Sequence, residues 1–492
     1  MSQIKKLAGQ TAIYGLSSIV GRLLNYLLVP LYTRIFVPEA YGVVSEFYAY
    51  VTFLIVLYTY GMETAYFHFS NKNDDNNTVY SNSFSTLVIT SVLLSSLLIL
   101  FSQWFAAILG YADHPEYIVW FALILAFDAI TALPFAKLRQ ENKAKKFALI
   151  KIVNISSNIG LNLFFLAFLP HITNNNSFSV LYNPAIGVGY VFIANLISSL
   201  ITLLFFYRDF KLFRLNINKE LMSNMLVYAF PLLIAGFAGM INETLDRAIL
   251  KYLVADKSTA LHQLGIYSAC YKLSIIMTLF VQTYRYAAEP FFFSQQSKKN
   301  NKQLYATIMN YFVFVCSLIF LGVMLYMNIA KYFIGEKFHE GLKVVPVLLF
   351  ANLFLGVYLN LSMWYKLSGQ TKYGAWFSIV GAAITIILNF ILIPVMGYMG
   401  AAWATFICYG AMMFISYIYG QKHYPIPYNI KICLLIILLS VGLWITSDYL
   451  FVIYPMGILL SNITKLIVLS VFIMVSWRLI IPSSTTELVD EQ

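Results

Sequence analysis

Ionisable side chains inside long apolar segments are the residues of this chain best placed to do chemistry. They are Arg22, Glu46, Glu63, Asp128, Glu243, Asp246, Arg247, Lys272, Arg285 and Glu289. An ionised side chain at the centre of a bilayer costs roughly 2.5 to 3.5 kcal/mol, so such residues usually face a wet interior or one another. Their positions therefore predict a polar site inside a membrane.

Arg22 is the strongest single candidate, because no acidic residue shares its segment. Asn25 and Tyr26 follow three and four residues later and extend a polar stripe along one helical face. A guanidinium group presents a rigid fork that binds phosphate oxygens in a bidentate manner. Arg22 and Asn25 are thus predicted to bind a phosphate-bearing substrate. The alternative is structural, with Arg22 holding its helix to Glu46, Glu63 or Asp128.

Lys272 has no acidic residue three or four positions away in its own segment. Two roles stay open for it: a second contact to phosphate, or an ion pair with Asp246 or Glu46 across a cavity.

Two other pairs of charges are spaced to neutralise themselves. Glu243 and Arg247 are four residues apart, and so are Arg285 and Glu289, so each pair shares a helix face. Pairing within the helix is the simplest expectation for these four residues.

Asp128 falls near the middle of its segment and is either a proton or cation site or part of a hydrogen-bond network. The full set of candidates divides by expected role. Candidates for substrate binding are Arg22, Asn25, Glu46, Arg247 and Lys272, and candidates for energy coupling are Glu63, Asp128 and Asp246. We expect no metal site, no cofactor and no catalytic residue.

The elements that position these residues follow from composition. Hydrophobic residues make up 60% of the chain and charged residues 11%, far below the roughly 25% charged residues of soluble domains. About fourteen apolar runs reach the roughly 20 residues that a membrane helix needs. They span 12–36, 41–67, 84–110, 115–137, 147–169, 185–207, 224–253, 263–289, 304–328, 341–365, 374–396, 398–419, 430–451 and 454–480. The sequence predicts an all-α integral membrane protein with short loops.

The distribution of Lys and Arg predicts the orientation. With the N-terminus inside, most basic residues lie on the inner side, and the outer side holds only Arg34, Lys251, Lys257, Lys331, Lys337 and Lys343. The net charge of +11 is therefore a topology signal and a contact surface for anionic membrane lipids, not a nucleic-acid footprint. All four Cys residues fall in apolar runs without paired spacing, so no disulfide is expected.

The two halves of the chain share a pattern. Each begins with a Tyr-led helix that contains glycines and an Asn (Asn25, Asn242), and each has a Gly at the entry to the next helix (Gly42, Gly265). This predicts two six-helix bundles, 1–210 and 211–424, related by pseudo-two-fold symmetry, followed by an extra helix pair and cytoplasmic tail at 425–492. Parallel repeats of this kind are typical of transporters that work by alternating access.

Three stretches carry a family resemblance: LVPLYTRIFVPEAYG at 28–42, LDRAILKYL with LGIYSACYKL at 245–253 and 264–273, and GAAWAT at 400–405. They resemble polysaccharide flippases of the multidrug/oligosaccharidyl-lipid/polysaccharide exporter superfamily, across essentially the whole chain. The resemblance implies two bundles around a central cavity lined by the first, second, seventh and eighth helices. The extra helix pair, with Lys465, forms either a groove for a lipid tail or a peripheral addition.

The resemblance also implies a function. We expect a bacterial inner-membrane flippase that carries a polyprenyl-diphosphate-linked oligosaccharide from the inner to the outer leaflet for cell-surface polysaccharide synthesis. Its termini would be cytoplasmic, and its partners would be that substrate, membrane lipids and other polysaccharide-assembly membrane proteins.

Two alternatives are kept. A multidrug exporter of the same superfamily would need an acidic cavity for cationic substrates; Arg22, Arg247 and Lys272 argue against it, whereas the buried acidic residues leave it open. A membrane glycosyltransferase or polymerase would need catalytic residues in an outer loop, and the stretch 170–184 has no acidic residue.

Arg22→Gln tests the first candidate. It should reduce translocation of a diphosphate-linked substrate while leaving membrane insertion intact, because it removes a charge from lipid. Leaflet-to-leaflet transfer in proteoliposomes measures the effect, with the amount of inserted protein as the control. Normal transfer by a well-inserted variant would remove Arg22 from the mechanism.

Overall fold

A computed structural model of the chain describes residues 23–24, 26–70, 76–173, 182–213, 217–295, 301–454 and 457–489, and the regular structure in these ranges is helical throughout. Contacts along the backbone divide the chain into two compact units, Met1–Ala248 (unit 1) and Ile249–Gln492 (unit 2). The boundary falls inside one long helix, whereas the sequence places the seam between its halves near residue 210. The three-part division 1–210, 211–424 and 425–492 stays a prediction.

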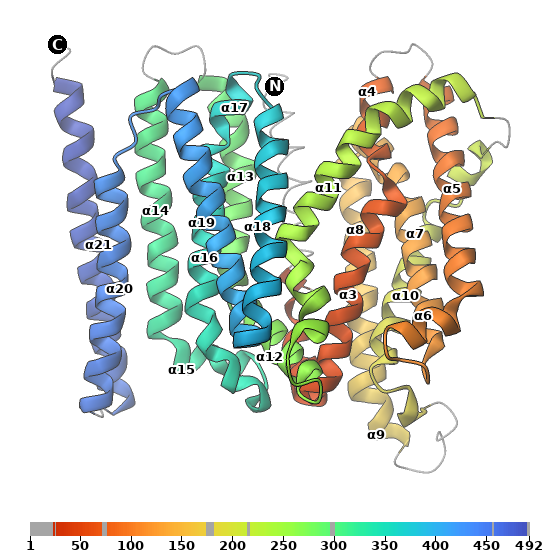
Figure 1. Cartoon of the computed structure of the whole chain (residues 1–492), viewed down its shortest axis with the longest axis horizontal. Helices are drawn as coiled ribbons and strands as arrows, with labels where there is room; N and C mark the ends of the chain where they lie inside the picture. Colours follow the sequence, from red (N-terminus) through yellow and green to blue (C-terminus); the bar gives the residue numbers. More distant parts are fainter. Residues whose placement is uncertain are drawn as a thin grey trace. The chain divides into compact units, whose positions relative to one another are not determined.

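Unit 1 holds the helices of the first half of the chain (Figure 1). They are α2 (Leu28–Ile35), α3 (Pro38–Thr59), α4 (Met62–Ser70), α5 (Asn76–Leu100), α6 (Ser102–Ile108), α7 (Pro115–Gln140), α8 (Ala144–Leu163), the π-helix η1 (Phe164–Phe168), α9 (Leu169–Thr173), η2 (Pro184–Ile186), α10 (Gly189–Leu204), η3 (Asp209–Leu212) and most of α11 (Lys219–Leu253).

Unit 2 begins in the last turns of α11. Its helices are α12 (Ala260–Leu273), α13 (Ile275–Gln295), α14 (Asn301–Leu325), α15 (Met327–Ala330), η4 (Lys331–Phe333), η5 (Glu336–Val344), α16 (Val345–Leu361), α17 (Met363–Leu367), α18 (Lys372–Met396), α19 (Tyr398–His423), α20 (Ile430–Ile453) and α21 (Ile458–Val489).

The all-α membrane architecture predicted from the sequence is confirmed. Within the described ranges, 11 helices are long and apolar enough to cross a membrane, or up to 12 if α12 and α13, which meet at a 50° bend, form one span. The sixth predicted span corresponds to α10, which is shorter, and most of the first predicted span lies outside the described residues. The count of fourteen is therefore not confirmed.

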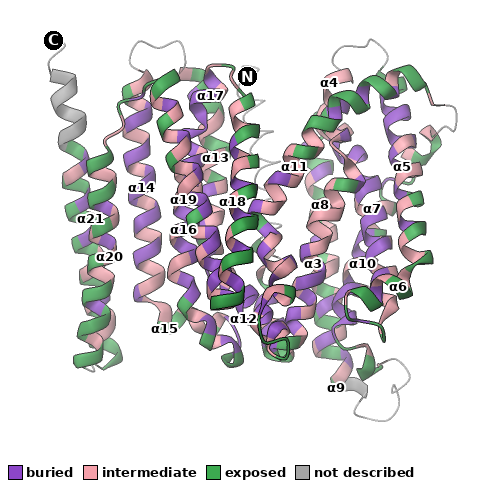
Figure 2. Cartoon of the chain, viewed as in Figure 1, coloured by how far each residue is buried: buried purple, intermediate pink, exposed green. Residues whose placement is uncertain are grey.

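Burial separates central helices from helices that face lipid (Figure 2). In α7, 67% of the membrane-spanning window is buried, against 11% in α21. Many exposed residues of α20 and α21 are large and apolar, such as Leu438, Leu459 and Leu466. Lipid tails solvate such side chains as well as a protein core does, so these helices need only one packed face.

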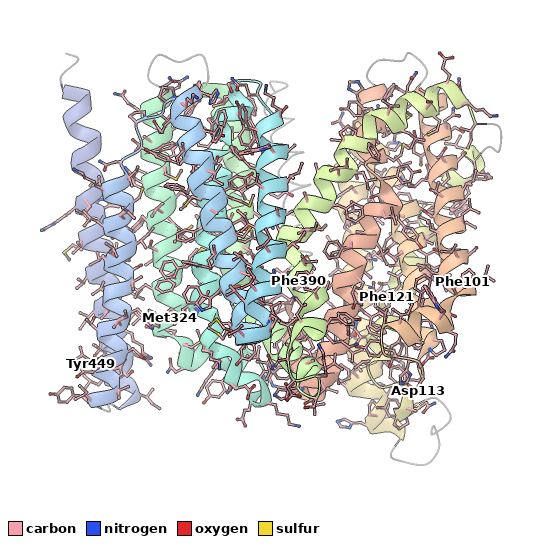
Figure 3. All side chains as sticks on the ribbon, viewed as in Figure 1. Phe101, Asp113, Phe121, Met324, Phe390 and Tyr449 are labelled. Atoms are coloured by element: carbon pink, nitrogen blue, oxygen red, sulfur yellow. The ribbon has the colours of Figure 1, made fainter. Side chains whose placement is uncertain are left out.

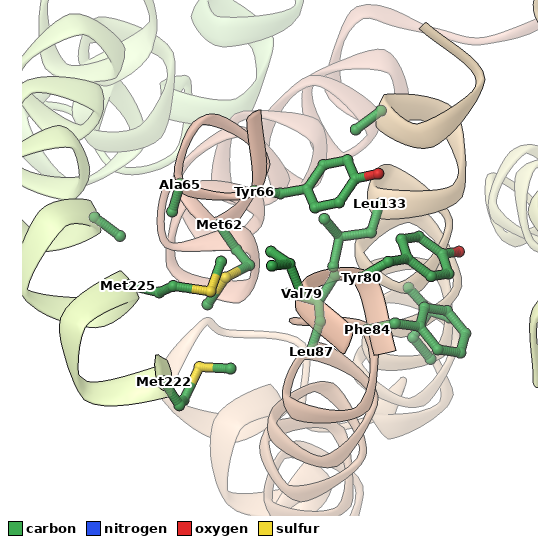
Figure 4. Packing of buried hydrophobic residues seen from close by; sticks show 13 residues of the cluster. Met62, Ala65, Tyr66, Val79, Tyr80, Phe84, Leu87, Leu133, Met222 and Met225 are labelled. Atoms are coloured by element: carbon green, nitrogen blue, oxygen red, sulfur yellow. The ribbon is translucent and has the colours of Figure 1, made fainter. Parts of the chain in front are cut away.

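A Met- and Tyr-rich core holds unit 1 together at one end (Figure 4). Residues of α4, α5 and α7 surround Met222 and Met225 from the start of α11. Met fills irregular gaps because its side chain is unbranched and flexible, which suits a contact between elements far apart in sequence. A second core lies around Phe47 of α3, whose ring stacks on Phe121 of α7 with centroids 5.1 Å apart.

Unit 2 is built on α16, α18 and α19, whose shared core contains Trp364, Phe377 and Tyr409. The C-terminal helix pair packs on α14, where Phe314 stacks on Phe472 of α21 and Phe320 meets Trp444 of α20 edge-on. Lys465 of α21 is buried and donates a hydrogen bond of 3.0 Å to Asn328 Oδ1. The extra pair is thus joined to its unit by aromatic contacts along α14 and by a polar contact to α15.

The second predicted membrane helix is broken at Tyr60 and Gly61, which separate α3 from α4. Their φ angles are 33° and 72°, in the left-handed region that L-residues adopt only at a cost. A Cβ atom on Gly61 would also lie 3.2 Å from the carbonyl oxygen of Ala229 in α11. Only glycine meets both requirements, so this break fixes the approach of α4 to α11.

Gly61→Ala should therefore destabilise the protein by about 1 to 2 kcal/mol, from the left-handed φ alone. The shift in the thermal unfolding midpoint of purified protein in detergent measures this effect. Gly160→Ala is the matched control, because Gly160 lies inside α8 with open space around it. Equal midpoints for the two variants would show that the Gly61 break is not conformationally demanding.

Candidate functional site

The candidate residues predicted from the sequence fall in three places. Arg22 and Asn25 lie outside the described residues. Glu46, Glu63, Asp128, Asp246 and Arg247 lie in unit 1, and Lys272 lies in unit 2. Unit 1 therefore holds the carboxylates predicted to take part in coupling.

Asp128 lies at the midpoint of α7 and accepts a hydrogen bond of 2.8 Å from Ser199 Oγ of α10. Lys151 of α8 attracts the same carboxylate electrostatically. Lys151 lies roughly 10 Å into α8 at 1.5 Å per residue, and its ammonium is 4.2 Å from the ring centroid of Phe135. Asp128 is thus bonded to α10 by a hydroxyl group and lies within the electrostatic influence of a lysine of α8.

Lys151 begins a stripe of polar residues along α8, followed by Asn154, Asn158 and Asn162 at intervals of three, four and four residues. These intervals place all four residues on one helix face. We call this stripe, together with Asp128 and its partners in α10, the polar seam.

The asparagines of the polar seam bind neighbouring helices. Asn154 Nδ2 donates to Thr202 Oγ1 at 2.8 Å, and Asn162 Nδ2 donates to Asn158 Oδ1 at 2.8 Å. Asn162 Oδ1 in turn accepts a hydrogen bond of 2.8 Å from the Tyr32 hydroxyl. Asn154 Nδ2 also donates to the backbone carbonyl of Ser198 at 3.1 Å, so the side chains of the seam link α8 to α2 and α10.

The polar seam was not among the predicted sites. Lys151 counted only as one of the basic residues of the inner side, and the three asparagines were not among the candidates. The signal was present in the spacing, because polar residues at i, i+3, i+7 and i+11 in an apolar segment mark a face that packs on other polar groups.

Glu63 and its surroundings form an ionic cluster near one end of unit 1. The Glu63 carboxylate contacts Arg139 of α7 at 2.5 Å. Close by in the chain, Lys137 lies 3.4 Å from Asp209, which also accepts a hydrogen bond from the Tyr80 hydroxyl at 2.9 Å. These contacts connect α4, α5, α7 and η3, so Glu63 has a clear packing role.

Glu46 is fully buried within unit 1. Its two carboxylate oxygens accept hydrogen bonds from the hydroxyl groups of Tyr50, one turn later, and Tyr111, which follows α6. Phe47, the next residue, packs against the rings of Tyr111 and Phe121. The aromatic surroundings make Glu46 an anchor between α3 and the segment after α6.

The expected ion pair between Glu243 and Arg247 is not what the structure shows. Arg247 Nε lies 3.5 Å from the Asp246 carboxylate, and the Arg247 guanidinium also bonds the backbone carbonyl of Glu243. Asp246 is buried, whereas Glu243 is exposed. The buried carboxylate takes the cation, because an unpaired charge costs more there than at the surface.

The expected pair between Arg285 and Glu289 also needs correction. Glu289 instead forms an ion pair with Lys366 of α17 at 2.8 Å. Side chains of a packed helix point toward neighbouring helices, so a partner there competes with one a turn away.

Lys272 lies in the last turn of α12, directly before the 50° bend into α13. Ser274 at the bend is fully buried and accepts a hydrogen bond of 3.4 Å from Asn352 Nδ2 of α16. Lys272 therefore lies directly beside the bend between α12 and α13.

Side chains fill most of the space between the helices of each unit, as Figure 3 shows for Phe121 inside unit 1. An apolar cavity of about 380 Å³ remains in unit 1 beside Phe121, lined also by Phe47, Tyr50 and Leu245. Unit 2 has a comparable apolar cavity of about 350 Å³ between α14, α16, α19 and α20. Another cavity, at one end of unit 2, has a lining that includes charged and polar side chains.

The pairing in the polar seam predicts non-additive stability. Asp128→Asn and Lys151→Met should each destabilise the protein, because each leaves the other charge uncompensated, and the double variant should recover about 0.5 to 3 kcal/mol of the summed loss. Unfolding of purified protein in mixed SDS and neutral detergent measures the cycle. Lys145→Met is the control, since Lys145 is exposed on the same helix. Strict additivity would contradict the coupling.

Comparisons with known proteins agree with this architecture. A solved structure described as "Lipid II flippase MurJ, inward closed conformation" matches with a TM-score of 0.74 and 15% identity, covering 94% of this chain and 98% of that chain. An inward-facing multidrug resistance MATE family transporter of the MOP superfamily matches with a TM-score of 0.61 and 14% identity, covering 82% of this chain and 94% of that chain. At such identities the similarity establishes the fold. None of the curated proteins compared with this sequence matches it significantly.

A family profile described as "Polysaccharide biosynthesis protein" matches residues 7–296. This match covers more than half of the chain, and the resemblance found in the sequence is confirmed. The chain belongs to the polysaccharide biosynthesis protein family and has the fold of transporters of the MOP superfamily.

Proposed function

We propose that this protein is a flippase that moves a polyprenyl-diphosphate-linked oligosaccharide from the inner to the outer leaflet of the bacterial inner membrane, for cell-surface polysaccharide synthesis. The observation that carries the proposal is the coincidence of a polysaccharide biosynthesis family match with a fold shared along 94% of the chain with a lipid II flippase. One of the two similar solved structures is a flippase and the other is a transporter. This similarity supports a transport function for the present protein and not an enzymatic one.

Charge distribution supports the direction of transfer. The basic residues gather on the side predicted to be cytoplasmic, where both termini would also lie. A membrane potential, negative inside, is worth roughly 2.3 kcal/mol per elementary charge per 100 mV. It drives an anionic diphosphate headgroup outward, so export needs no further energy source in principle.

The contacts of the candidate residues help to assign their roles. For binding the diphosphate we retain Arg22, Asn25, Arg247 and Lys272, whose side chains offer the donors that phosphate oxygens accept. The contacts of Glu46 to two tyrosines favour a packing role over substrate binding.

For coupling to an ion we favour Asp128. Its carboxylate lies in mid-membrane within a seam of hydroxyl and amide groups, which is the setting of proton relays in transporters. Glu63 and Asp246 each have a close cationic partner, so a coupling role for them requires that the ion pair opens.

Alternating access by the two halves predicted from the sequence, 1–210 and 211–424, is part of the proposal. Membrane lipids and other polysaccharide-assembly membrane proteins are the proposed partners.

The test is leaflet-to-leaflet transfer of a fluorescent polyprenyl-diphosphate oligosaccharide in proteoliposomes, read by quenching of the outer leaflet. We expect transfer above the rate of protein-free liposomes. A potential of 100 mV oriented to drive anions should accelerate it by up to about 50-fold per charge moved, and the reversed potential should slow it. The matched control is an equal density of protein inactivated by heat before reconstitution.

The same vesicles test the remaining alternative, a multidrug exporter, whose fold this chain also shares. Export of a cationic dye such as ethidium, with no transfer of the lipid under either potential, would overturn the flippase proposal. Transfer of the lipid without dye export would support it.

A further inference from the structure

A polar cavity of about 630 Å³ opens at one end of unit 2. It is formed by the loop between α11 and α12, the first turns of α12, η5 and the junction of α18 and α19. Its polar lining comprises Asp256, Thr259, His262, Gln263, Glu340 and Lys343. The volume lies in the range of 300 to 1,000 Å³ that is usual for sites that bind small ligands.

Close backbone approaches fix the shape of this cavity. Gly397, between α18 and α19, has a φ of 58°, and a Cβ atom there would lie 2.2 Å from Gln263 Oε1. The missing side chain lets Gln263 Oε1 accept a hydrogen bond of 3.1 Å from the backbone N–H of Tyr398. Gly341 of η5 likewise allows Ile266 of α12 to pack against it. The four segments therefore form a built site and not a chance surface hollow.

The carboxylates of the cavity are oriented and keep free acceptor capacity. Asp256 accepts hydrogen bonds from Ser258 Oγ at 2.6 Å and Ser258 N–H at 3.0 Å, and these bonds lower the pKa of Asp256. Glu340 Oε1 lies 3.5 Å from His262 Nε2. An ionised carboxylate offers about four acceptor positions, so each can still bind donors from a ligand.

Donor groups and an apolar wall complete the lining. The Lys343 ammonium lies 5.1 Å from the ring centroid of Tyr398 and is exposed. The last turn of α18, from Ile393 to Met396, supplies the apolar wall. A ligand that fits must carry several hydroxyl donors and acceptors on an apolar frame, and a sugar ring has both.

Other ligand classes fit less well. Among the described residues, no three His, Cys, Asp or Glu side chains converge as a metal site requires. Two carboxylates against one lysine would repel a phosphate group. An acyl or prenyl chain would leave the polar lining without hydrogen bonds.

The cavity lies at the end of unit 2 that carries the α11–α12 connection and η5, with Lys251, Lys257, Lys331, Lys337 and Lys343. Lys372 begins α18 at one end of the unit, and the cavity is formed where α18 finishes at Met396. Lys366, Lys422 and Lys431 also belong to the connections at the end where α18 begins. The orientation predicted from the Lys and Arg bias of the whole chain assigns the end where α18 begins to the cytoplasmic side, and so it assigns the cavity to the outer side.

We propose that this cavity binds the oligosaccharide portion of the translocated lipid after it reaches the outer leaflet, as an exit site for neutral, hydroxyl-rich glycans. The inference rests on the proposed function, which supplies the glycan and the orientation. An exit site of this kind holds the headgroup at the outer surface and so opposes its return.

Protection of a single reporter cysteine tests the site. Thr259→Cys places a thiol in the lining, and a membrane-impermeant maleimide added to intact spheroplasts should label it from outside. The probe is the free oligosaccharide released by mild acid from the lipid used in the transfer assay. At millimolar concentration it should slow labelling at least threefold. Lys337→Cys, exposed on η5 outside the lining, is the matched control and should not be protected.

A second substitution ties protection to the carboxylates. Protection should be lost when Glu340→Gln or Asp256→Asn is combined with Thr259→Cys, whereas the labelling rate without oligosaccharide should equal that of Thr259→Cys alone, as expected when the surroundings of the thiol are unchanged. The unsubstituted protein sets the background from its own cysteines.

The outcomes separate the two proposals. Transfer of the lipid by the unsubstituted protein, with Thr259→Cys labelled at the same rate with and without the oligosaccharide, would overturn the exit site alone. Labelling only after permeabilisation would place the cavity on the inner side and also overturn it. Absence of lipid transfer would refute the proposed function and this inference with it.

Discussion

The lack of water in the bilayer core is the constraint on which this structure depends, because every polar group placed there must find its partner within the protein. The polar seam of unit 1 shows how this is met. Asp128 is bonded by Ser199 and attracted by Lys151, and Asn154 and Asn162 reach helices α10 and α2. Each of these bonds fixes the rotation of a helix about its own axis. Apolar packing alone cannot do so in lipid, since tails solvate the outer face of a helix as well as a neighbour does.

The same constraint explains why several charged side chains find their partner in another helix, whereas Arg247 pairs with Asp246 inside α11. Glu63 meets Arg139, Glu289 meets Lys366, and the buried Lys465 meets Asn328. An ion pair between residues one turn apart leaves both side chains on the surface of their own helix, whereas a pair between helices is shielded by the packing around it. Charge thus serves as a specific contact where the hydrophobic effect gives little selectivity.

The sequence predicted the membrane architecture well because the length of an apolar run is set directly by bilayer thickness. The break at Tyr60 and Gly61 and the bend before Ile275 were not predicted, because they depend on tertiary contacts with Ala229 and Asn352. Partners such as Glu46 and Tyr111, 65 residues apart, leave no periodic trace in one sequence. Lys151 was overlooked for another reason: it lies near the start of the predicted span 147–169 and was therefore grouped with the basic residues of the inner side.

A buried charge is therefore a weaker sign of function than the sequence alone suggests. Glu46 and Glu63 satisfy the criterion of charge within an apolar segment, yet their contacts join elements of unit 1. The groups able to act on a ligand are those that keep hydrogen-bond capacity after their structural bonds are counted. Asp256 and Glu340 meet that test with carboxylate oxygens still able to accept, and they lie where helices end. Spare acceptor capacity, counted residue by residue, separates a site that can bind from a scaffold that is already satisfied.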